Sequence, residues 1–365
     1  MSVLGARKQF EEIAVYSPGK PIEELKREMG ITEVVKMASN ENPFGASPKA
    51  LEAMKEELTQ LHYYPEITSP LVREKLANRL GISPDAVVVG NGSDEVIRML
   101  TRTYLSPGEE VVMASVTFPR YKTNVIIEGG IPVDVAMKDG AHDLEAMLQA
   151  ITSRTKMVFV CNPNNPTGTI VDKQELQMFI ERVPKDVMVI LDEAYYEFIR
   201  GDNDPNSLAL LDKHTNLVIL RTFSKIYGLA SARIGYGIMH PEMVAELLKS
   251  KEPFNVNRMA QAGALAALDD EAFLHMTLEE NNRGRMYLEE EAEALGLSYF
   301  DTHTNFIMID VKMDAELVYN RLLEQGVIIR PGHMMGYPTM LRVTIGTKEQ
   351  NEKFVESLKK ALAVS

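Results

Sequence analysis

One lysine follows a predicted buried strand, and its neighbours in the sequence could bind a phosphate group. The apolar run 217–220 predicts that strand, and Lys225 follows it with Ser224 as its neighbour. Arg233 comes eight residues later and opens a second apolar run. Ligands of open α/β sheets bind in the crevice outside the carboxyl ends of the strands. We therefore hypothesise that Lys225 forms a Schiff base with pyridoxal 5′-phosphate (PLP), and that Ser224 and Arg233 contact its phosphate. The alternative is a surface lysine after a strand.

Two further polar residues follow predicted strands. Asp192 comes directly after the apolar run 187–191, and Asn165 lies in the turn-rich segment 161–168. A buried carboxylate in the first position could keep a pyridine nitrogen protonated, which makes the ring an electron sink. The amide in the second position could donate to a phenolic oxygen. A loop cap and a tight turn are the structural alternatives.

The segment 90–95 joins a predicted strand to an amphipathic helix and contains Gly92, Ser93 and Asp94. Backbone N–H groups at a helix N-terminus bind phosphate well, although many such turns are purely structural. The segment is not a dinucleotide fingerprint, because Glu95 stands where the last glycine belongs. This excludes a nicotinamide-dependent dehydrogenase of that type.

Two arginines lie in apolar runs near the C-terminus. Arg342 belongs to the run 341–345, and Arg330 ends the run 327–330. Arginine suits planar, bidentate recognition of a carboxylate. Each side chain is therefore either a ligand clamp or a charge on a solvated strand face.

The elements that must position these residues fall into two groups. Up to about residue 250, continuous apolar strands alternate with helices, which predicts a parallel sheet covered on both faces. These strands are expected at 86–89, 110–113, 155–160 and 187–191. Beyond that point the pattern predicts a smaller α+β unit. Its parts are a long helical stretch at 258–295, short strands at 305–311, 327–330 and 341–345, and a final helix from Thr347.

The composition limits the partners and the compartment. The chain has 365 residues, which suits two domains, and its net charge of −13 argues against a nucleic-acid or anionic-membrane partner. The single Cys161 allows no intrachain disulfide and favours a reducing compartment, so we expect a cytoplasmic protein. No apolar run approaches the roughly 18 residues of a membrane span. We expect no metal site.

Nine motifs, in order along nearly the whole chain, resemble the PLP-dependent aminotransferases of fold type I. Within these, they are most similar to the histidinol-phosphate aminotransferase family. The motifs are 40–43, 64–65, 92–95, 164–168, 192–195, 224–225 with Arg233, 253–256, 304–306 and 342–347.

The resemblance implies an α/β fold in which a large domain has a mostly parallel seven-stranded sheet covered by helices. It also implies a smaller α+β domain. We expect an N-terminal arm at 1–40 that belongs to the small domain, a large PLP-binding domain at 41–252 and a small C-terminal domain at 253–365.

The same resemblance assigns residues to each part of the cofactor. It makes Lys225 the Schiff-base lysine, which moves the proton during catalysis, and Asp192 the partner of the pyridine nitrogen. Asn165 and Tyr195 are assigned to the phenolic oxygen. The remaining contacts, at the phosphate and the ring face, fall to Gly92, Ser93, Asp94, Phe118, Thr222, Ser224 and Arg233.

Substrate and partner residues follow from the same family. Tyr64 resembles a tyrosine that reaches the phosphate from the other subunit, which implies a homodimer. Arg342 is expected to clamp an α-carboxylate, while Arg330 and Tyr16 bind the side-chain phosphate of histidinol phosphate. Asn42 is assigned to the same substrate site.

The implied reaction belongs to histidine biosynthesis. L-Histidinol phosphate and 2-oxoglutarate give imidazole acetol phosphate and L-glutamate, with ping-pong kinetics through Lys225. An aminotransferase for phenylalanine or tyrosine stays open, because such members look nearly the same in sequence. A PLP-dependent amino-acid-phosphate decarboxylase and a non-catalytic PLP-fold protein are the alternatives from other classes.

Overall fold

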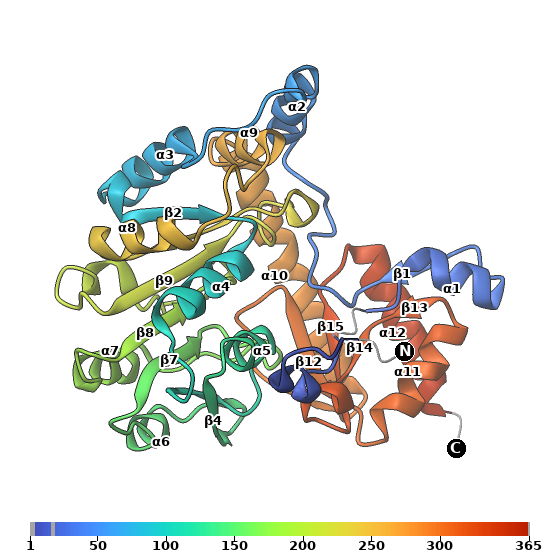
Figure 1. Cartoon of the computed structure of the whole chain (residues 1–365). Coiled ribbons are helices and arrows are strands. Elements are labelled where there is room, and N and C mark those ends of the chain that lie inside the picture. Colours follow the sequence, from blue (N-terminus) through green and yellow to red (C-terminus); the bar gives the residue numbers. More distant parts are fainter. Residues whose placement is uncertain (1–3, 16–18, 364–365) are drawn as a thin grey trace.

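A seven-stranded sheet forms the centre of the larger part of the molecule (Figure 1). The structure is a computed structural model that describes residues 4–15 and 19–363. Across the sheet the strands are β2 (Val87–Gly90), β10 (Gly235–Ile238), β9 (Leu217–Thr222), β8 (Met188–Asp192), β7 (Thr155–Cys161), β3 (Glu110–Ala114) and β4 (Ile131–Val135). Strand β10 runs antiparallel to the other six, so the predicted mostly parallel, seven-stranded sheet is confirmed.

Helices cover both faces of this sheet, because neighbouring side chains of a strand point to opposite sides. Val218 and Leu220 of β9 belong to the apolar core beneath α4 (Ser93–Tyr104), α5 (Arg120–Ile127) and α8 (Pro241–Ser250). Leu217 and Ile219 belong to the core on the other face. The helices over that face are α3 (Pro70–Leu80), α6 (Leu144–Gln149), α7 (Lys173–Arg182) and α9 (Arg258–Ala267).

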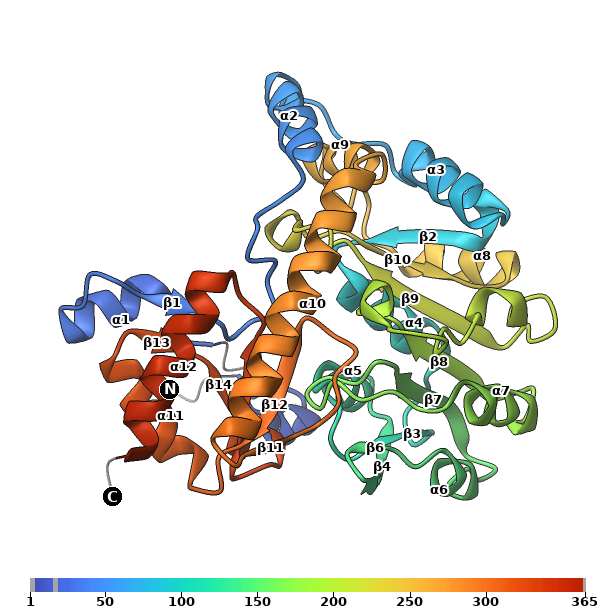
Figure 2. The same ribbon diagram turned by 180° about the vertical axis from the view of Figure 1, so that it is seen from behind.

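A second, antiparallel sheet lies in the C-terminal part. Its strands are, in order, β11 (Ser298–Tyr299), β12 (Phe306–Asp310), β15 (Met340–Thr344) and β14 (Arg330–Pro331). Helices α11 (Ala315–Glu324) and α12 (Lys348–Ala363) pack on it through one apolar core. Seen from behind, α10 (Glu271–Ala294) runs from the large sheet to the small one (Figure 2).

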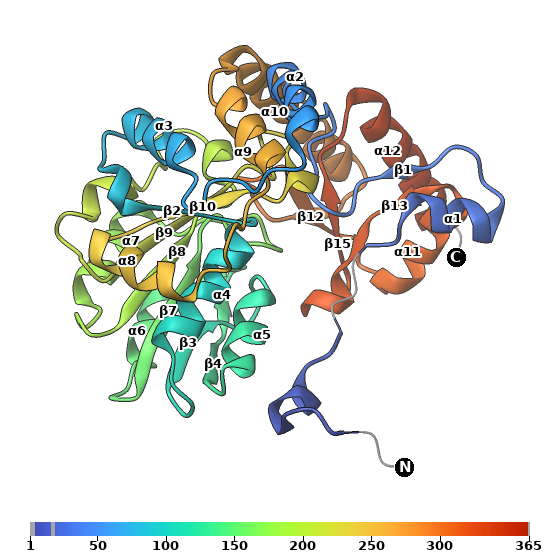
Figure 3. The ribbon, with the colours of Figure 1, turned by 45° about the horizontal axis from the view of Figure 1, so that its top comes forward.

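The N-terminal segment lies against both parts. The short strand β1 (Val35–Lys36) pairs in parallel with β13 (Val327–Ile328), beside α1 (Ile22–Met29). Arg7, just before the 3-10 helix η1 (Lys8–Glu12), donates from Nη2 to the Ile127 carbonyl at the end of α5 (3.0 Å). Further along, α2 (Pro48–Glu57) packs beside α9 (Figure 3). The domain boundaries at residues 40 and 252 stay a prediction.

Three features differ from the sequence expectations. The stretch 258–295 is not one helix, because the chain turns between α9 and α10, where the Asp270 carboxylate accepts the Ser47 hydroxyl (2.6 Å). The run 327–330 divides into β13 and β14, which pair with different strands. Strand β4 and the hairpin of β5 (Met137–Lys138) with β6 (Ala141–His142) were not expected. None of the described helices is both long and apolar enough to span a membrane.

Candidate active site

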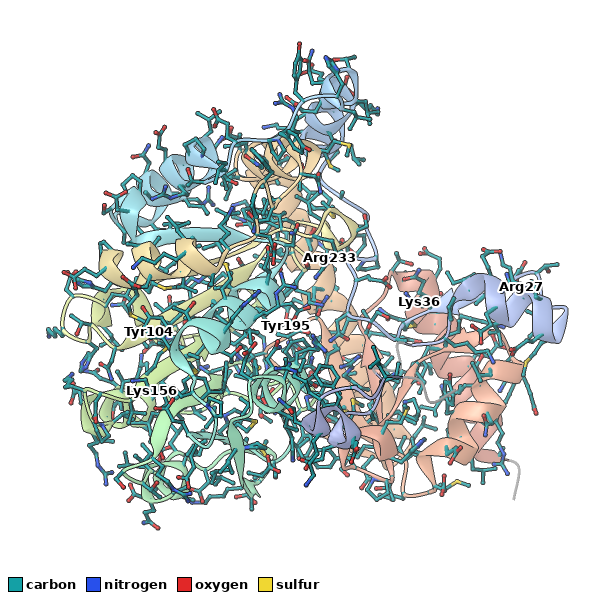
Figure 4. All side chains as sticks on the ribbon, viewed as in Figure 1. Arg27, Lys36, Tyr104, Lys156, Tyr195 and Arg233 are labelled. Carbon is teal, nitrogen blue, oxygen red and sulfur yellow. The ribbon has the colours of Figure 1, made fainter. Side chains whose placement is uncertain are left out.

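A pocket of about 270 Å³ lies at the carboxyl ends of β8 and β9, where the large sheet faces the small one. Tyr195 and Arg233, labelled in Figure 4, lie between the two sheets. Most of the residues predicted to form the site line this one pocket. They are Gly92, Ser93, Asp94, Phe118, Asn165, Asp192, Tyr195, Thr222, Ser224, Lys225, Arg233, Arg330 and Arg342.

Lys225 faces the pocket from the turn that follows β9. Gly228 allows this turn, because its φ is +69° and a Cβ there would lie 2.0 Å from the Gly45 carbonyl oxygen. Burial is the main reason why the pKa of Lys225 is lowered to about 8, and the positive charge of Arg342 lowers it further. This pKa leaves roughly a tenth of the amine neutral at pH 7, and the neutral form is the one that a nucleophile requires.

Asp192 ends β8 with its carboxylate in the pocket wall, only 3% exposed. Its Oδ2 accepts the Tyr121 hydroxyl at 2.6 Å, and its Oδ1 accepts the Ala194 N–H at 3.1 Å. Burial raises the pKa of Asp192 to about 6, against the lowering effect of the Tyr121 hydrogen bond. The carboxylate is thus held in one orientation, with acceptor capacity left for a donor in the pocket.

Tyr121 was not among the site residues predicted from the sequence. It lies three residues after Phe118, and the two rings meet edge to face with centroids 5.5 Å apart. Phe118 lies just before α5, and Tyr121 lies in the first turn of that helix. Its hydrogen bond to Asp192 joins residues from different elements, so no local signal in the sequence indicates it.

Arg342 is buried at the pocket, so its charge does not lie on a solvated strand face, while its role as a ligand clamp stays a prediction. Its Nη1 donates to Asn165 Oδ1 at 2.6 Å, and its Nη2 donates to the Ala38 carbonyl at 2.7 Å. Arg330 stands opposite Arg342 in the pairing of β14 with β15 and lines the same pocket. Two guanidinium groups therefore lie on the side of the pocket formed by the small sheet.

Tyr195 is enclosed in the pocket wall, in contact with the small sheet. Its hydroxyl oxygen accepts Asn40 Nδ2 at 2.9 Å, and its ring meets Phe306 edge to face. Burial raises the pKa of this phenol well above its usual value. Tyr195 therefore keeps its proton and can donate a hydrogen bond.

The turn from β2 into α4 and the residues after β9 form a site suited to an anion. Gly92 has a φ of +75°, and a Cβ on it would lie 2.8 Å from Arg233 Nη2, so the backbone and the guanidinium approach closely only because residue 92 is glycine. The backbone N–H groups that begin α4 at Ser93 border the same space. Gly235 allows β10 to lie against this turn, since a Cβ there would be 2.4 Å from Ser93 N.

Two predicted residues do not line the pocket, and a third lies outside the part of the chain that the structure describes. Tyr64 is 78% exposed and stacks on Phe254 in a separate surface groove. Asn42 donates from Nδ2 to the Ile226 carbonyl (2.8 Å), which steadies the turn after Lys225, and its contact with a substrate stays a prediction. Tyr16 lies outside the described residues.

The comparisons with known proteins agree on one family. The family described as "Aminotransferase class I and II" matches residues 32–358. The histidinol-phosphate aminotransferase of Brevibacillus brevis is 50% identical over 345 residues, which cover 94% of this chain and 95% of that protein. The histidinol-phosphate aminotransferase of a Geobacillus species is 47% identical over 354 residues, 97% of each chain.

Among solved structures, the histidinol-phosphate aminotransferase of Sinorhizobium meliloti, in complex with pyridoxal-5′-phosphate, superposes with a TM-score of 0.91. Its sequence is 28% identical, and the match covers 99% of this chain and 98% of that one. This neighbour confirms the expected α/β fold of type I. The chain belongs to the histidinol-phosphate aminotransferase family, within the class I and II aminotransferases.

Proposed function

We propose that this protein is a PLP-dependent aminotransferase of histidine biosynthesis, which converts L-histidinol phosphate and 2-oxoglutarate into imidazole acetol phosphate and L-glutamate. The observation that carries the proposal is the pocket itself. It combines a buried lysine of lowered pKa, a buried aspartate and an anion-binding turn, in a chain of this family.

The residues of the pocket fit PLP. Lys225 can form a Schiff base with the aldehyde, and the Asp192 carboxylate can accept a hydrogen bond from the protonated pyridine nitrogen. The close approach of Arg233 to the backbone of Gly92 makes a cradle for the phosphate, which a Cβ at residue 92 would fill. When bound, PLP supplies an electron sink for negative charge that develops on the substrate carbon.

Lys225 is the residue that transfers the proton in this reaction. Once the incoming amino group has taken its place, Lys225 Nζ is a free base next to the substrate and removes the proton from Cα. With 2-oxoglutarate in the site, Lys225 would deliver a proton to the carbon that becomes Cα of glutamate. The lowered pKa of about 8 suits both tasks, because the amine is a competent base near neutral pH and a competent acid once protonated.

Asp192 and the donors around the ring set the charge of the cofactor. The ionised carboxylate of Asp192 holds a proton on the pyridine nitrogen. Asn165 and Tyr195 donate to the phenolic oxygen. Support for the second role comes from the protonated, buried phenol of Tyr195 and from Arg342, which holds the Asn165 side chain through its oxygen and so directs the amide nitrogen away from the guanidinium.

Two arginines serve two chemically different substrates. Arg342 binds the α-carboxylate of glutamate and 2-oxoglutarate. Histidinol phosphate has no α-carboxylate, and its phosphate is bound by Arg330 together with Tyr16. The adjacent positions of Arg330 and Arg342 on paired strands allow one pocket to accept both substrates in turn.

The working unit in this proposal is a cytoplasmic homodimer. In its own chain Tyr64 is exposed and lies outside the pocket, which supports a role at the phosphate of a partner subunit. The cytoplasmic location rests on the single cysteine and stays a prediction.

The test compares amino donors with 2-oxoglutarate as the acceptor. We expect kcat/KM to be highest for histidinol phosphate, with phenylalanine and tyrosine far behind. Arg330→Ala should lower kcat/KM for histidinol phosphate by roughly ten- to a hundred-fold, and Arg342→Ala should do so for 2-oxoglutarate. A preference for aromatic donors would contradict the substrate, and release of CO2 without an oxo-acid acceptor would contradict the transamination.

A further inference from the structure

We propose that Asn40 is a positioning residue for this reaction, because its side-chain amide turns the proton of the Tyr195 hydroxyl into the pocket. The inference rests on the proposed function, in which Tyr195 donates to the phenolic oxygen of PLP. Asn40 was not among the residues selected from the sequence, although Asn42 of the same motif was.

Asn40 joins three parts of the chain at the pocket. It is 2% exposed and has a left-handed backbone with φ +54°. Its N–H donates to Thr344 Oγ1 on β15 (2.9 Å), and its carbonyl accepts Asn305 Nδ2 (3.0 Å). The same carbonyl lies 3.4 Å from Lys225 Nζ, and its side-chain Nδ2 lies 2.9 Å from the Tyr195 hydroxyl oxygen.

Thr344 fixes which end of the amide faces Tyr195. The Thr344 hydroxyl oxygen accepts the Asn40 N–H, so its proton is available to donate, and Asn40 Oδ1 lies 3.2 Å away to accept it. In the flipped orientation the Thr344 hydroxyl proton would lose this acceptor and would face the amide NH2 group instead. Asn40 Nδ2 therefore faces Tyr195 as a donor.

This donor decides where the proton of Tyr195 points. A phenol has one proton, and burial keeps it on Tyr195 by raising the pKa. Because the oxygen accepts from Asn40, the O–H bond cannot point at Asn40 and is directed elsewhere, and the pocket is the space that Tyr195 lines. A donor that also accepts a hydrogen bond is strengthened by it, so Asn40 both aims and polarises this hydroxyl.

Asn40 carries no charge, in contrast to the groups around it. The titratable groups that act on Lys225 come from several elements, and they are Arg342, Glu41, Asp94 and Arg233. Those that act on Tyr195 are Arg342, Cys161 and Asp192. A substitution that deletes the amide without adding charge therefore isolates the hydrogen bond from these electrostatic effects.

The experiment uses the full-length protein loaded with PLP and records the pH midpoint of its visible absorbance change. Asn40→Gly deletes the amide but keeps the left-handed backbone and the carbonyl. Loss of a well-aimed donor to the phenolic oxygen should raise the midpoint by about one pH unit. Asn40→Asp should raise it further, because a carboxylate accepts the Tyr195 proton and turns it away from the pocket.

The Tyr195→Phe background separates a positioning role from other effects. If Asn40 acts through the Tyr195 hydroxyl, Asn40→Gly should move the midpoint in the wild type but not in Tyr195→Phe. The shift that Asn40→Asp causes in Tyr195→Phe measures the added charge alone. Asn216→Ala is the matched control, since Asn216 is a buried asparagine that bonds backbone carbonyls away from the pocket, and it should leave the midpoint unchanged.

Two results would overturn the proposal: an unchanged midpoint in Asn40→Gly, or the same shift of Asn40→Gly in both backgrounds. If Asn40→Gly does not fold, Thr344→Val takes its place, because it removes the hydroxyl that orients the amide, and it should raise the midpoint in the same direction. If Thr344→Val also leaves the midpoint unchanged, the proposal fails. Absence of a PLP absorbance in the wild type would instead contradict the proposed function.

Discussion

Burial shifts the pKa values of two residues in the pocket in opposite directions. It lowers the pKa of Lys225 to about 8 and raises the pKa of Asp192 to about 6, because removal from water disfavours the charged form of each group. Both groups consequently titrate close to neutral pH. The role of Lys225 needs the neutral amine, whereas the role of Asp192 needs the charged carboxylate, so each requires a pH above its own pKa.

The hydrogen bond from Tyr121 favours the charged form of Asp192, so its removal should raise the pKa of Asp192 further above 6. For Tyr121→Phe we expect the acid side of the pH profile of kcat/KM to move to higher pH by about one unit. The measurement is kcat/KM for histidinol phosphate over the pH range on both sides of neutrality.

Tyr299→Phe is the matched control for this prediction. It also removes a tyrosine hydroxyl that is bonded to a carboxylate, that of Glu293 at 2.7 Å, but on the surface and away from the pocket. Its pH profile should equal that of the wild type. A profile for Tyr121→Phe that coincides with that of Tyr299→Phe would show that Tyr121 does not tune Asp192.

At the scale of residues, the pocket residues that could be predicted from the sequence are those that follow the end of a strand. Lys225, Asp192 and the Gly92 turn follow apolar runs directly, and parallel strands end on one edge of a sheet. Asn40 and Tyr121 could not be predicted in the same way, because each acts through a contact with a residue more than 70 positions away.

At the scale of elements, a buried ion pair holds the ends of β8 and β9 together behind the pocket. Successive residues of a strand alternate between faces, so Asp192 and Thr222 line the pocket while Glu193 and Arg221 lie away from it. Glu193 Oε2 accepts Arg221 Nε at 2.9 Å, and its Oε1 accepts the Ser207 hydroxyl at 2.6 Å.

Arg221→Met should destabilise the protein strongly, because it leaves the Glu193 carboxylate buried without its cation. We expect a loss of roughly 3–5 kcal/mol in the free energy of unfolding, measured by denaturant titration. Arg283→Met makes the same change on the surface, where Arg283 pairs with Glu280, and should cost far less. Equal losses in the two variants would refute a structural role for the buried pair.

The apolar strands of the central sheet were predictable, because two covered faces require an almost continuous apolar run. Strand β4 was not, since it lies at the edge of the sheet, is mostly not buried, and contains Pro132 and Asp134. The turn between α9 and α10 could not be predicted from the sequence either. Its reason is the contact of Asp270 with Ser47, which belongs to another part of the chain.

At the scale of the whole molecule, one region of the surface is unusually apolar. Several large apolar side chains between the end of α2 and the start of α3 are exposed, and Phe254 lies beside them. They are Leu58, Leu61, Tyr63, Tyr64 and Ile67. Gathered apolar side chains on a surface mark an interaction site, and this region is where the proposed homodimer would place its second subunit.

Mixing two defective variants tests whether Tyr64 acts across subunits. Lys225→Ala and Tyr64→Ala should each have low activity alone. After unfolding and refolding together, their mixed dimers should contain one intact site, which combines Lys225 of one subunit with Tyr64 of the other. We expect about a quarter of wild-type activity. Activity no higher than the mean of the two variants would place Tyr64 in the site of its own chain or outside any site.

The central claim is that Lys225 carries the cofactor, and its most direct test is chemical. The protein is loaded with PLP, reduced with borohydride, digested, and its peptides are mapped by mass spectrometry. We expect the cofactor to be fixed to the peptide that contains Lys225, and prior addition of histidinol phosphate to prevent this labelling. Labelling of another lysine would refute Lys225 as the Schiff-base lysine, and labelling that histidinol phosphate does not prevent would refute histidinol phosphate as the amino donor.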